Sequence, residues 1–374
     1  MTLTEAFDGL DDPRTGPAQR HDLTEMILMA LCAVLCGADS WVDCAEWAED
    51  NEDWLKRYLV LEHGTPSHDT FGRVFRLLDG KVFEACFRAW IGDLIGVVAG
   101  VVAIDGKTAC GSRDGHNTAL HTISAYATAS GLCLAQEHTR GKGHEIPAIK
   151  ALLDTLALKG CIVTIDAIGC QTEIAQKILD RGGDYLLAVK DNQETLAKAV
   201  REFFADGESA GFGTLPVDRY QTVDKDHGRI ETRRALWVTD LSWLAKKIRE
   251  HWPKLAGVGM IERRREISGT VSMERAFYIG SRGVTTAESF ATAARCHWGI
   301  ENRLHWVLDV TFREDDCRVR KDHAPHNFAA LRKFALALLR QDTQYPKRSL
   351  RSRRKTAERL ADYRASLLGL TLQG

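Results

Sequence analysis

The stretch "HWGIENRLHWVLDVTFREDD", residues 297–316, combines acidic, amide, imidazole and indole side chains at helical spacing. With about 100° between successive residues, five of them share one side of a helix: Trp298, Glu301, Asn302, His305 and Asp309. A polar cluster on a face that also carries large aromatic rings is typical of a carboxylate held in place by packing. An ordinary amphipathic helix with a solvated row of charges explains the stretch equally well, so the rest of the chain must decide.

Two further carboxylates follow apolar runs that are typical of strands. Asp105 ends the predicted strand "VVAI", and Asp166 ends "CIVTI". An aspartate in such a place often only begins a turn. On neighbouring strands of a three-layer sheet, however, both would come close to Glu301, and three converging carboxylates repel one another. A divalent cation relieves that repulsion, and hard oxygen ligands suit Mg²⁺ or Mn²⁺.

Hydrophobic periodicity predicts the elements that must position these residues. Residues 1–95 are predicted to be helical, with apolar side chains three and four residues apart in 24–38 and 69–95. Residues 96–192 alternate between β-branched runs and amphipathic stretches in the order βββαβαβ. This order predicts an α/β fold whose three-layer core contains a mixed sheet.

The pattern changes again beyond residue 192. Several strand-like runs predict a separate β-rich insertion, and helical periodicity then returns around Glu301. The last part of the chain is predicted to be a basic tail. The expected regions are therefore residues 1–95 (helical), 96–192 (first part of the core), 193–285 (insertion), 286–345 (second part of the core) and 346–374 (tail).

Charge is distributed unevenly along the chain. The formal net charge is −1, but residues 1–60 hold thirteen Asp and Glu against four Lys and Arg. The bias is reversed in residues 340–359, with eight basic residues against two acidic, and in residues 246–282, with nine against four. Local basic surface attracts phosphates whatever the total charge, so both segments are candidates for nucleic-acid contact. A solvated charge run is the alternative interpretation of each.

Composition argues against a membrane or secreted protein. The chain has 374 residues, of which 44% are hydrophobic and 27% charged, as in globular proteins of two or three domains. Its longest apolar run, residues 26–38, is too short to span a bilayer, and the N-terminus lacks the pattern of a signal peptide. Ten cysteines without a CxxC pair argue against structural zinc. A cytoplasmic, nucleoid-associated protein without a membrane partner is expected.

The motifs and their order resemble the DDE transposases of bacterial insertion sequences, of the ISAs type, also called H-repeat-associated proteins. The resemblance is carried by "AIDGKTACGS", "GHEIPAIKALL", "VTIDAIGCQ", "DYLLAVKDNQ" and "HWGIENRLHWVLDVTFREDDCRVR". "DPR" and "HDTFGRVFRLLD" also resemble that family's associated helical region. Each motif alone is weak, but their order and spacing over about residues 10–345 are specific.

The resemblance implies an RNase H-like catalytic core and a DNA transposase that cleaves insertion-sequence ends and transfers strands to target DNA. It places the catalytic, metal-binding triad on Asp105, Asp166 and Glu301, with two Mg²⁺ or Mn²⁺ ions as cofactors. Asp309 is the alternative third ligand, and Glu301 is preferred because "IEN" matches the family motif. The implied partner is double-stranded DNA, both element ends and target, bound by a homodimer.

Six residues are predicted to contact DNA: Lys107, Lys190, Arg295, His305, Arg263 and Arg264. His305 is equally well explained as a hydrogen-bonded packing histidine, whereas Trp298 and Trp306 are predicted to lie in the core. The helical region is expected to recognise DNA ends or make dimer contacts. The tail would either bind DNA non-specifically or neutralise the acidic N-terminal region.

Two rival functions remain open. A structure-specific nuclease could use the same core without strand transfer. A DNA-binding remnant could have lost catalysis, but the intact set of Asp105, Asp166 and Glu301 argues against it.

Overall fold

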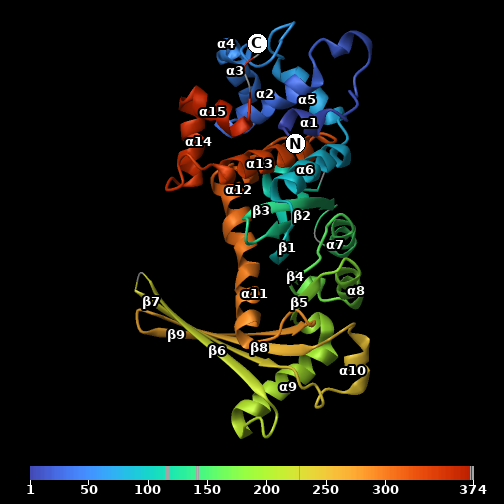
Figure 1. Cartoon of the computed structure of the whole chain (residues 1–374), viewed down its shortest axis with the longest axis vertical. Helices are drawn as coiled ribbons and strands as arrows, with labels where there is room; N and C mark the ends of the chain where they lie inside the picture. Colours follow the sequence, from blue (N-terminus) through green and yellow to red (C-terminus); the bar gives the residue numbers. More distant parts are fainter. Residues whose placement is uncertain (114–117, 140, 142, 227, 371, 373–374) are drawn as a thin grey trace.

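The computed structural model describes residues 1–113, 118–139, 141, 143–226, 228–370 and 372. The molecule is elongated, with helices at one end, a sheet across the middle and long strands at the other end (Figure 1). A long helix, drawn in orange, runs along the molecule from the long strands towards the helical end. This helix ends one residue before Glu301. The contacts that hold the helix against the sheet therefore decide where Glu301 lies.

The N-terminal region is helical, as the periodicity predicts. Its helices are α1 (Leu3–Phe7), α2 (Leu23–Cys36), α3 (Trp41–Asp50), α4 (Glu52–Leu55), α5 (His68–Leu77) and α6 (Gly80–Ile95), with a short 3₁₀ turn η1 (Gly16–Gln19). Asp22 caps α2, and Gly37 ends it with a φ of 130°, a conformation that glycine adopts without strain. Nearly every side chain of α2 is buried, because the other helices surround it.

Among the described residues, no single helix is long and apolar enough to cross a membrane. Only α2 and α3 taken together reach the required length and hydropathy, and they are bent by 97° relative to each other.

The sheet contains nine strands in the order β3-β2-β1-β4-β5-β9-β8-β7-β6. Its first five strands are β1 (Gly100–Ala109), β2 (Leu120–Ala127), β3 (Leu132–Thr139), β4 (Cys161–Ile165) and β5 (Asp184–Val189). Strands β1, β4 and β5 run parallel, whereas β2 and β3 form antiparallel pairs at one side. The expectation of an α/β fold with a mixed sheet is confirmed, and the strands and helices follow in the predicted order.

The β-rich insertion is not a separate unit. Its strands are β6 (Val217–Asp226), β7 (Arg229–Val238), β8 (Gly257–Ile267) and β9 (Thr270–Gly280), and its helices are α9 (Glu194–Ala210) and α10 (Lys246–His251). Strand β9 pairs antiparallel with β5, from Val189↔Phe277 to Leu186↔Gly280. The insertion therefore extends the core sheet, because β5 would otherwise present an unpaired edge.

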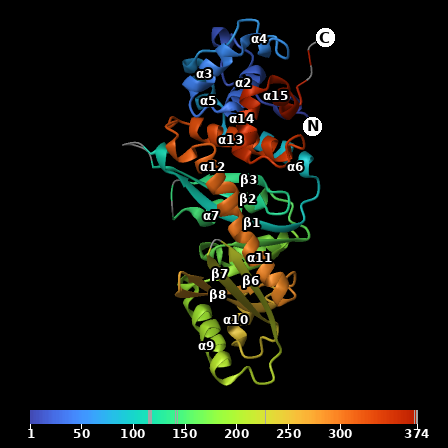
Figure 2. The same ribbon diagram turned by 90° about the vertical axis from the view of Figure 1, so that its left-hand side faces the viewer.

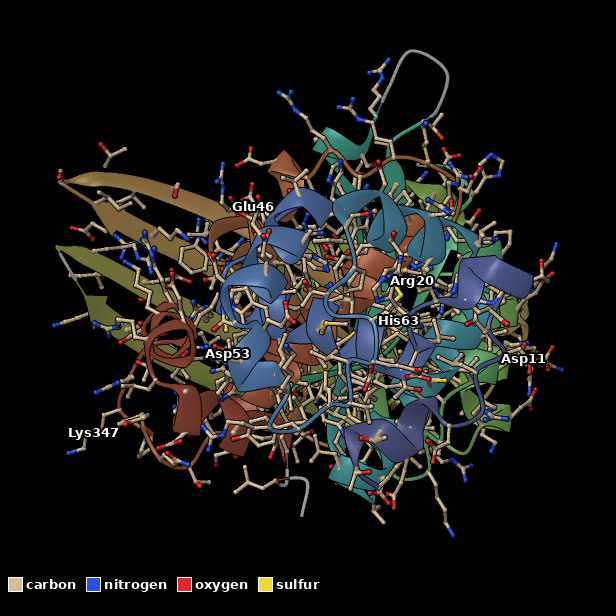
Figure 3. The ribbon with its side chains drawn as sticks, turned by 90° about the horizontal axis from the view of Figure 1, so that it is seen from above. Asp11, Arg20, Glu46, Asp53, His63 and Lys347 are labelled. Carbon is tan, nitrogen blue, oxygen red and sulfur yellow. The ribbon has the colours of Figure 1, made fainter. Side chains whose placement is uncertain are left out.

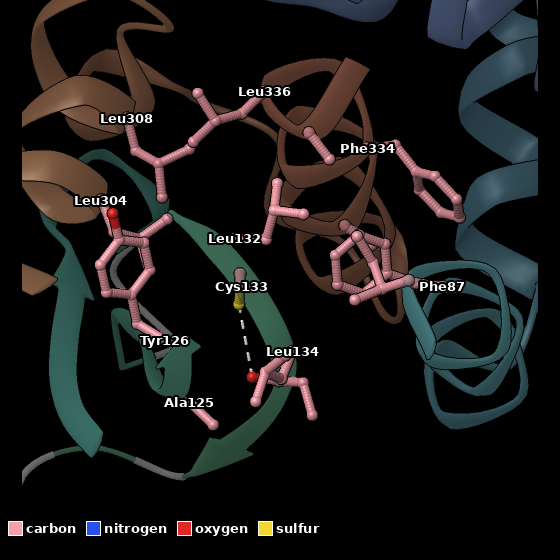
Figure 4. Close-up of a cluster of buried hydrophobic side chains, with 14 of the residues drawn as sticks. Phe87, Ala125, Tyr126, Leu132, Cys133, Leu134, Leu304, Leu308, Phe334 and Leu336 are labelled. Carbon is pink, nitrogen blue, oxygen red and sulfur yellow. Dashed lines mark hydrogen bonds between the residues drawn. The ribbon is translucent and has the colours of Figure 1, made fainter. Parts of the chain in front are cut away.

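Helices cover both faces of the first five strands, which gives three layers. Helices α7 (Glu145–Asp154) and α8 (Thr172–Asp180) lie on one face, and α11 (Ala287–Ile300) lies on the other (Figures 1 and 2). Helix α11 continues through η5 (Glu301–His305) into α12 (Trp306–Val310). Leu304 and Leu308 of this continuation pack near Tyr126 of the sheet, which fixes the helix against β2 (Figure 4).

The C-terminal segment is helical rather than an extended tail. Helix α13 (Ala324–Gln341) is almost completely buried, and α14 (Leu350–Arg359) and α15 (Ala361–Leu368) follow it. Arg354 of α14 donates to the carbonyl oxygen of Val34 in α2 at 2.8 Å. The segment folds back onto the protein because Arg353, Arg354 and Arg364 are buried and bonded to protein groups, so three of the eight basic residues in 346–374 are structural.

Candidate active site

Strand register brings the two aspartates together. The parallel pairing of β1 with β4 ends at Ile104↔Ile165, so Asp105 and Asp166 are the next residues on adjacent strands. Asp105 does not end its strand as expected, because β1 continues to pair with β2 as far as Ala109. Asp166 does end β4, and its carboxylate accepts a hydrogen bond from the backbone N–H of Ile168 at 3.2 Å.

Glu301 and His305 lie on a π-helical turn within the long helix. Turn η5 (Glu301–His305) interrupts the α-helical pattern between α11 and α12, a feature that often marks functional sites. The Nδ1 atom of His305 is 3.6 Å from a carboxylate oxygen of Asp105 and 3.6 Å from one of Glu301. One ligand atom from each of these three residues lies within 4.8 Å of the others, a separation that suits a shared metal ion.

The electrostatics of this cluster reflect uncompensated negative charge. Burial, to which the charges of Glu301 and Asp166 add, raises the pKa of Asp105 to about 8. The hydrogen bond from His305 lowers the pKa of Glu301, which is about half exposed. His305 itself is buried, so it faces the carboxylates and is not at a surface where it could contact DNA directly.

Two side chains that the sequence analysis did not single out position the cluster. His297 lies one turn before Glu301, and its Nδ1 is 3.2 Å from the hydroxyl of Thr164 on β4. Asn192 donates to the carbonyl oxygen of Ala167 at 2.6 Å and thereby holds the turn after Asp166. The repeated "HW" pair and the "KDNQ" motif contained these residues, but their partners lie 133 and 25 residues away in the chain.

Lys107, predicted to contact DNA, is instead surrounded by carboxylates. Its ammonium is 2.6 Å from Asp309, 3.2 Å from Glu314 and 3.1 Å from Asp315. Although burial opposes the charged form, Glu314, Asp309 and Asp315 together raise the pKa of Lys107. These ion pairs join β1 to α12 and to the 3₁₀ turn η6 (Glu314–Asp316).

The two candidates for the third carboxylate have different neighbours. Asp309 is bound to Lys107, whereas Glu301 lies beside Asp105. The β1 end is packed tightly there, since a Cβ atom on Gly111 would lie 2.3 Å from the carbonyl oxygen of Asp315. A side chain at that position would force the turn after β1, residues Cys110–Ser112, away from η6.

The other predicted DNA contacts are dispersed. Lys190 is exposed at the end of β5. Arg295 on α11 is exposed but bound to Asp224 at 3.1 Å. Arg263 and Arg264 are successive residues of β8 and so point to opposite faces, the first paired with Glu274 and the second with Glu266.

The two tryptophans of the long helix are not in the core. Trp298 is 51% exposed and Trp306 is 58% exposed. Arg263 lies over the ring of Trp298, with its guanidinium carbon 5.7 Å from the ring centroid. The expectation of burial is wrong because the buried face of this helix is formed by Leu304 and Leu308, while Trp298 and Trp306 lie outside the core.

Two family models match the chain. Residues 4–91 match a family described as DDE_Tnp_1-associated, and residues 70–338 match one described as Transposase DDE domain. The second match contains all three predicted triad positions.

Curated relatives match over almost the full length. The H repeat-associated putative transposase YhhI of Escherichia coli (strain K12) is 38% identical, and the match covers 98% of this chain and 97% of that protein. The putative transposase YncI of Escherichia coli O157:H7 is 35% identical over 96% of this chain and 92% of that protein. A shorter relative, the inactive transposase YbfQ of Escherichia coli (strain K12), is 43% identical over 17% of this chain and 71% of that protein.

Among solved structures, a piggyBac transposase synaptic complex with hairpin DNA matches with a TM-score of 0.41 and 11% identity, covering 98% of this chain and 76% of that one. The family matches and the long relatives agree with the resemblance found in the motifs. The chain belongs to the DDE transposase family.

Proposed function

We propose that this chain is an active DNA transposase that uses Asp105, Asp166 and Glu301 to cleave insertion-sequence ends and join them to target DNA. The observation that carries the proposal is the convergence of Asp105 with Glu301, two residues 196 positions apart, beside Asp166 on the adjacent strand. Converging carboxylates repel one another, and here they help to raise the pKa of Asp105, so this cluster is more consistent with catalysis than with stability.

The order and directions of the first five strands support an RNase H-like core. The order β3-β2-β1-β4-β5, with parallel β1, β4 and β5 and antiparallel β2 and β3, places both aspartates at neighbouring strand positions. Helix α11 then brings Glu301 from the opposite layer. Under this proposal the insertion of residues 193–285 enlarges the sheet without interrupting the site.

The residues of the cluster fit divalent cations. Asp105, Asp166 and Glu301 would hold Mg²⁺ or Mn²⁺, since their hard oxygen ligands and mutual repulsion favour such ions. Two bound ions would supply activation of water or of a 3′-hydroxyl and stabilisation of the leaving oxygen. His305 would orient the carboxylates of Asp105 and Glu301 through its Nδ1 atom.

The remaining protein groups would position the site and the DNA. His297 keeps α11 on β4, and Asn192 holds the turn after Asp166. Lys190 is exposed and would contact a phosphate. Arg295, Arg263 and Arg264 would reach DNA only by exchanging their present carboxylate partners for phosphates.

The test uses purified full-length protein, Mg²⁺ and linear DNA that carries the ends of the element. Nicks at the ends together with joined products are expected, and both should disappear with Asp105→Asn. Nicks without joined products, under conditions in which the ends are fully cleaved, would indicate the nuclease instead. DNA binding with neither product would indicate a remnant. Sedimentation of the DNA complex would test the proposed homodimer.

A further inference from the structure

Helix α14 has two basic faces with different surroundings. Arg353 and Arg354 point into the protein and are buried. Arg351, Lys355 and Arg359 recur every four residues, so they share one side of the helix, and all three are exposed. We call these three side chains the α14 stripe. Lys347, just before the helix, is also exposed and projects outward from the molecule in Figure 3.

The buried arginines fix the orientation of the stripe. Arg353 donates to the carbonyl oxygen of Leu339 at 2.8 Å and lies 3.5 Å from the Asp342 carboxylate. Arg354 lies over the ring of Phe312 at 4.6 Å and donates to Val34 in the helical region. These contacts hold the buried face of α14 against the protein. The outer face of the helix is therefore preorganised for a partner.

The charges of the stripe have no carboxylate partner within the described part of the chain. None of Arg351, Lys355 and Arg359 forms an ion pair there, although most arginines of β7, β8 and β9 do. Like charges four residues apart on a helix repel one another. A row of unpaired cations therefore favours a polyanionic partner, whose negative charges are closely and regularly spaced.

Helix α14 is attached to the protein near the end of the long helix that leads from the proposed site. Arg354 donates to the carbonyl oxygen of Thr311, which follows α12 directly. Thr311 is ten residues beyond Glu301, or about 15 Å along a helix axis at 1.5 Å per residue. DNA engaged at Glu301 would need to continue for only about four or five base pairs to reach α14, at 3.4 Å per base pair.

The overall arrangement is compatible with a duplex on this side of the molecule. In Figure 1, α14 and the outer ends of the β6–β9 strands project to the left, and α11 lies between them. Figure 2, which views that side, shows α11 and α12 in front. The Transposase DDE domain match ends at residue 338, so α14 lies outside both family models.

We propose that the α14 stripe binds the phosphate backbone of duplex DNA next to the cleavage site. The proposal rests on the proposed DNA-processing function of the same chain. It assigns separate roles to the two faces of one helix. Arg353 and Arg354 attach α14 to the protein, and Arg351, Lys355 and Arg359 supply sequence-independent affinity. A competing occupant is the acidic N-terminal region of a second copy, whose residues 1–60 carry thirteen acidic and four basic residues.

The test compares two full-length variants that each lose three exposed positive charges. The stripe variant carries Arg351→Gln, Lys355→Gln and Arg359→Gln. The control variant carries Lys246→Gln, Lys247→Gln and Arg249→Gln on α10, at the other end of the molecule (Figure 1). Binding to a duplex of about 30 base pairs is measured without divalent metal over about 50–300 mM salt, so that no cleavage is required. Circular dichroism and thermal melting establish that both variants are folded.

In the stripe variant, the slope of log Kd against log salt concentration should decrease by roughly 2–3, because each lost phosphate contact lowers this slope by about 0.9. The control should change by less than about 1 unit. Equal changes in both variants, or none in either, would overturn the proposal. A loss of self-association in sedimentation, with DNA binding intact, would overturn it in favour of the second copy.

Failure of the proposed function would look different. Metal-dependent cleavage by the unmodified chain is assayed separately, and its absence would refute catalysis even if the stripe variant bound DNA poorly. Conversely, normal cleavage with stripe-independent binding would refute only the role of α14.

Discussion

Two carboxylate clusters lie side by side along β1 and the long helix, and the second also includes residues of turn η6. One contains Asp105 of β1 and Glu301 of the π-helical turn, beside Asp166. The other contains Asp309, Glu314 and Asp315 around Lys107, two residues after Asp105. The second has a resident cation within 3.2 Å of all three carboxylates, whereas the first has the neighbouring imidazoles of His305 and His297.

The difference shows how one stretch of sequence can supply both a scaffold and a candidate metal site. A buried carboxylate that meets an ammonium stabilises the fold if its geometry is good. A buried carboxylate without such a partner is costly, and its pKa rises, as it does for Asp105. The uncompensated cluster is therefore the one that we expect to bind a divalent cation, while the compensated cluster holds β1 against the long helix.

The largest expected effect is a difference in the rate of DNA cleavage between variants of the two clusters. Asp105→Asn should lower the rate of DNA cleavage by at least about 10³-fold, because it removes a proposed metal ligand. Asp309→Asn should lower that rate by no more than about 10–100-fold, because it only loosens a supporting contact. Single-turnover cleavage of end-bearing DNA measures both variants. DNA affinity should stay within about twofold in each, and equal losses of activity would break the comparison.

The second effect concerns stability of the compensated cluster. Lys107→Met should reduce the free energy of unfolding by about 3–5 kcal/mol, since three carboxylates would lose their buried cation. Urea denaturation would measure the loss. Adding Glu314→Gln to Lys107→Met should recover part of it, because one unpaired buried charge is then removed. No recovery would mean that the side-chain packing of Lys107, rather than its charge, matters.

Glu84 lies outside both clusters and extends the comparison to a buried carboxylate whose charge depends on pH. It is buried, has Arg88 as a partner at 3.0 Å and accepts from the backbone N–H of Gln136. Burial raises the pKa of Glu84 to about 7. Between pH 4.5 and 7 the unfolded chain therefore loses this proton first, and the folded state loses stability as pH rises.

Glu84→Gln tests this expectation. The stability of the unmodified protein relative to the variant should fall by about 3 kcal/mol between those two pH values. Unfolding curves at matched pH give the difference, in which the other titrating groups cancel. A difference that is constant, or that rises with pH, would show that Arg88 compensates Glu84 fully.

The smallest expected effect is stabilisation by metal. Mn²⁺ at about 100 times its dissociation constant should stabilise the unmodified protein by about 2.7 kcal/mol and raise its melting temperature. Asp105→Asn should abolish the rise, and Asp309→Asn should retain it. A rise that persists in Asp105→Asn would place the ion elsewhere.

Sequence alone determined the main elements of the core and the positions of its acidic residues. The β-branched runs ending near Asp105 and Asp166 and the amphipathic pattern around Glu301 predicted two strands and a helix, because strand and helix periodicities are local. The order of the motifs also identified the family, which the matches confirm.

Tertiary structure decided which charges are compensated. Lys107 meets Asp309 and Glu314, which lie about 200 residues away, and no local pattern encodes such a pairing. The same holds for the pairing of β9 with β5 and for the burial of Arg354 against α2. A basic or acidic residue looks the same in sequence whether it is paired or free, because its partner is selected by long-range packing and by the high cost of burying an isolated charge.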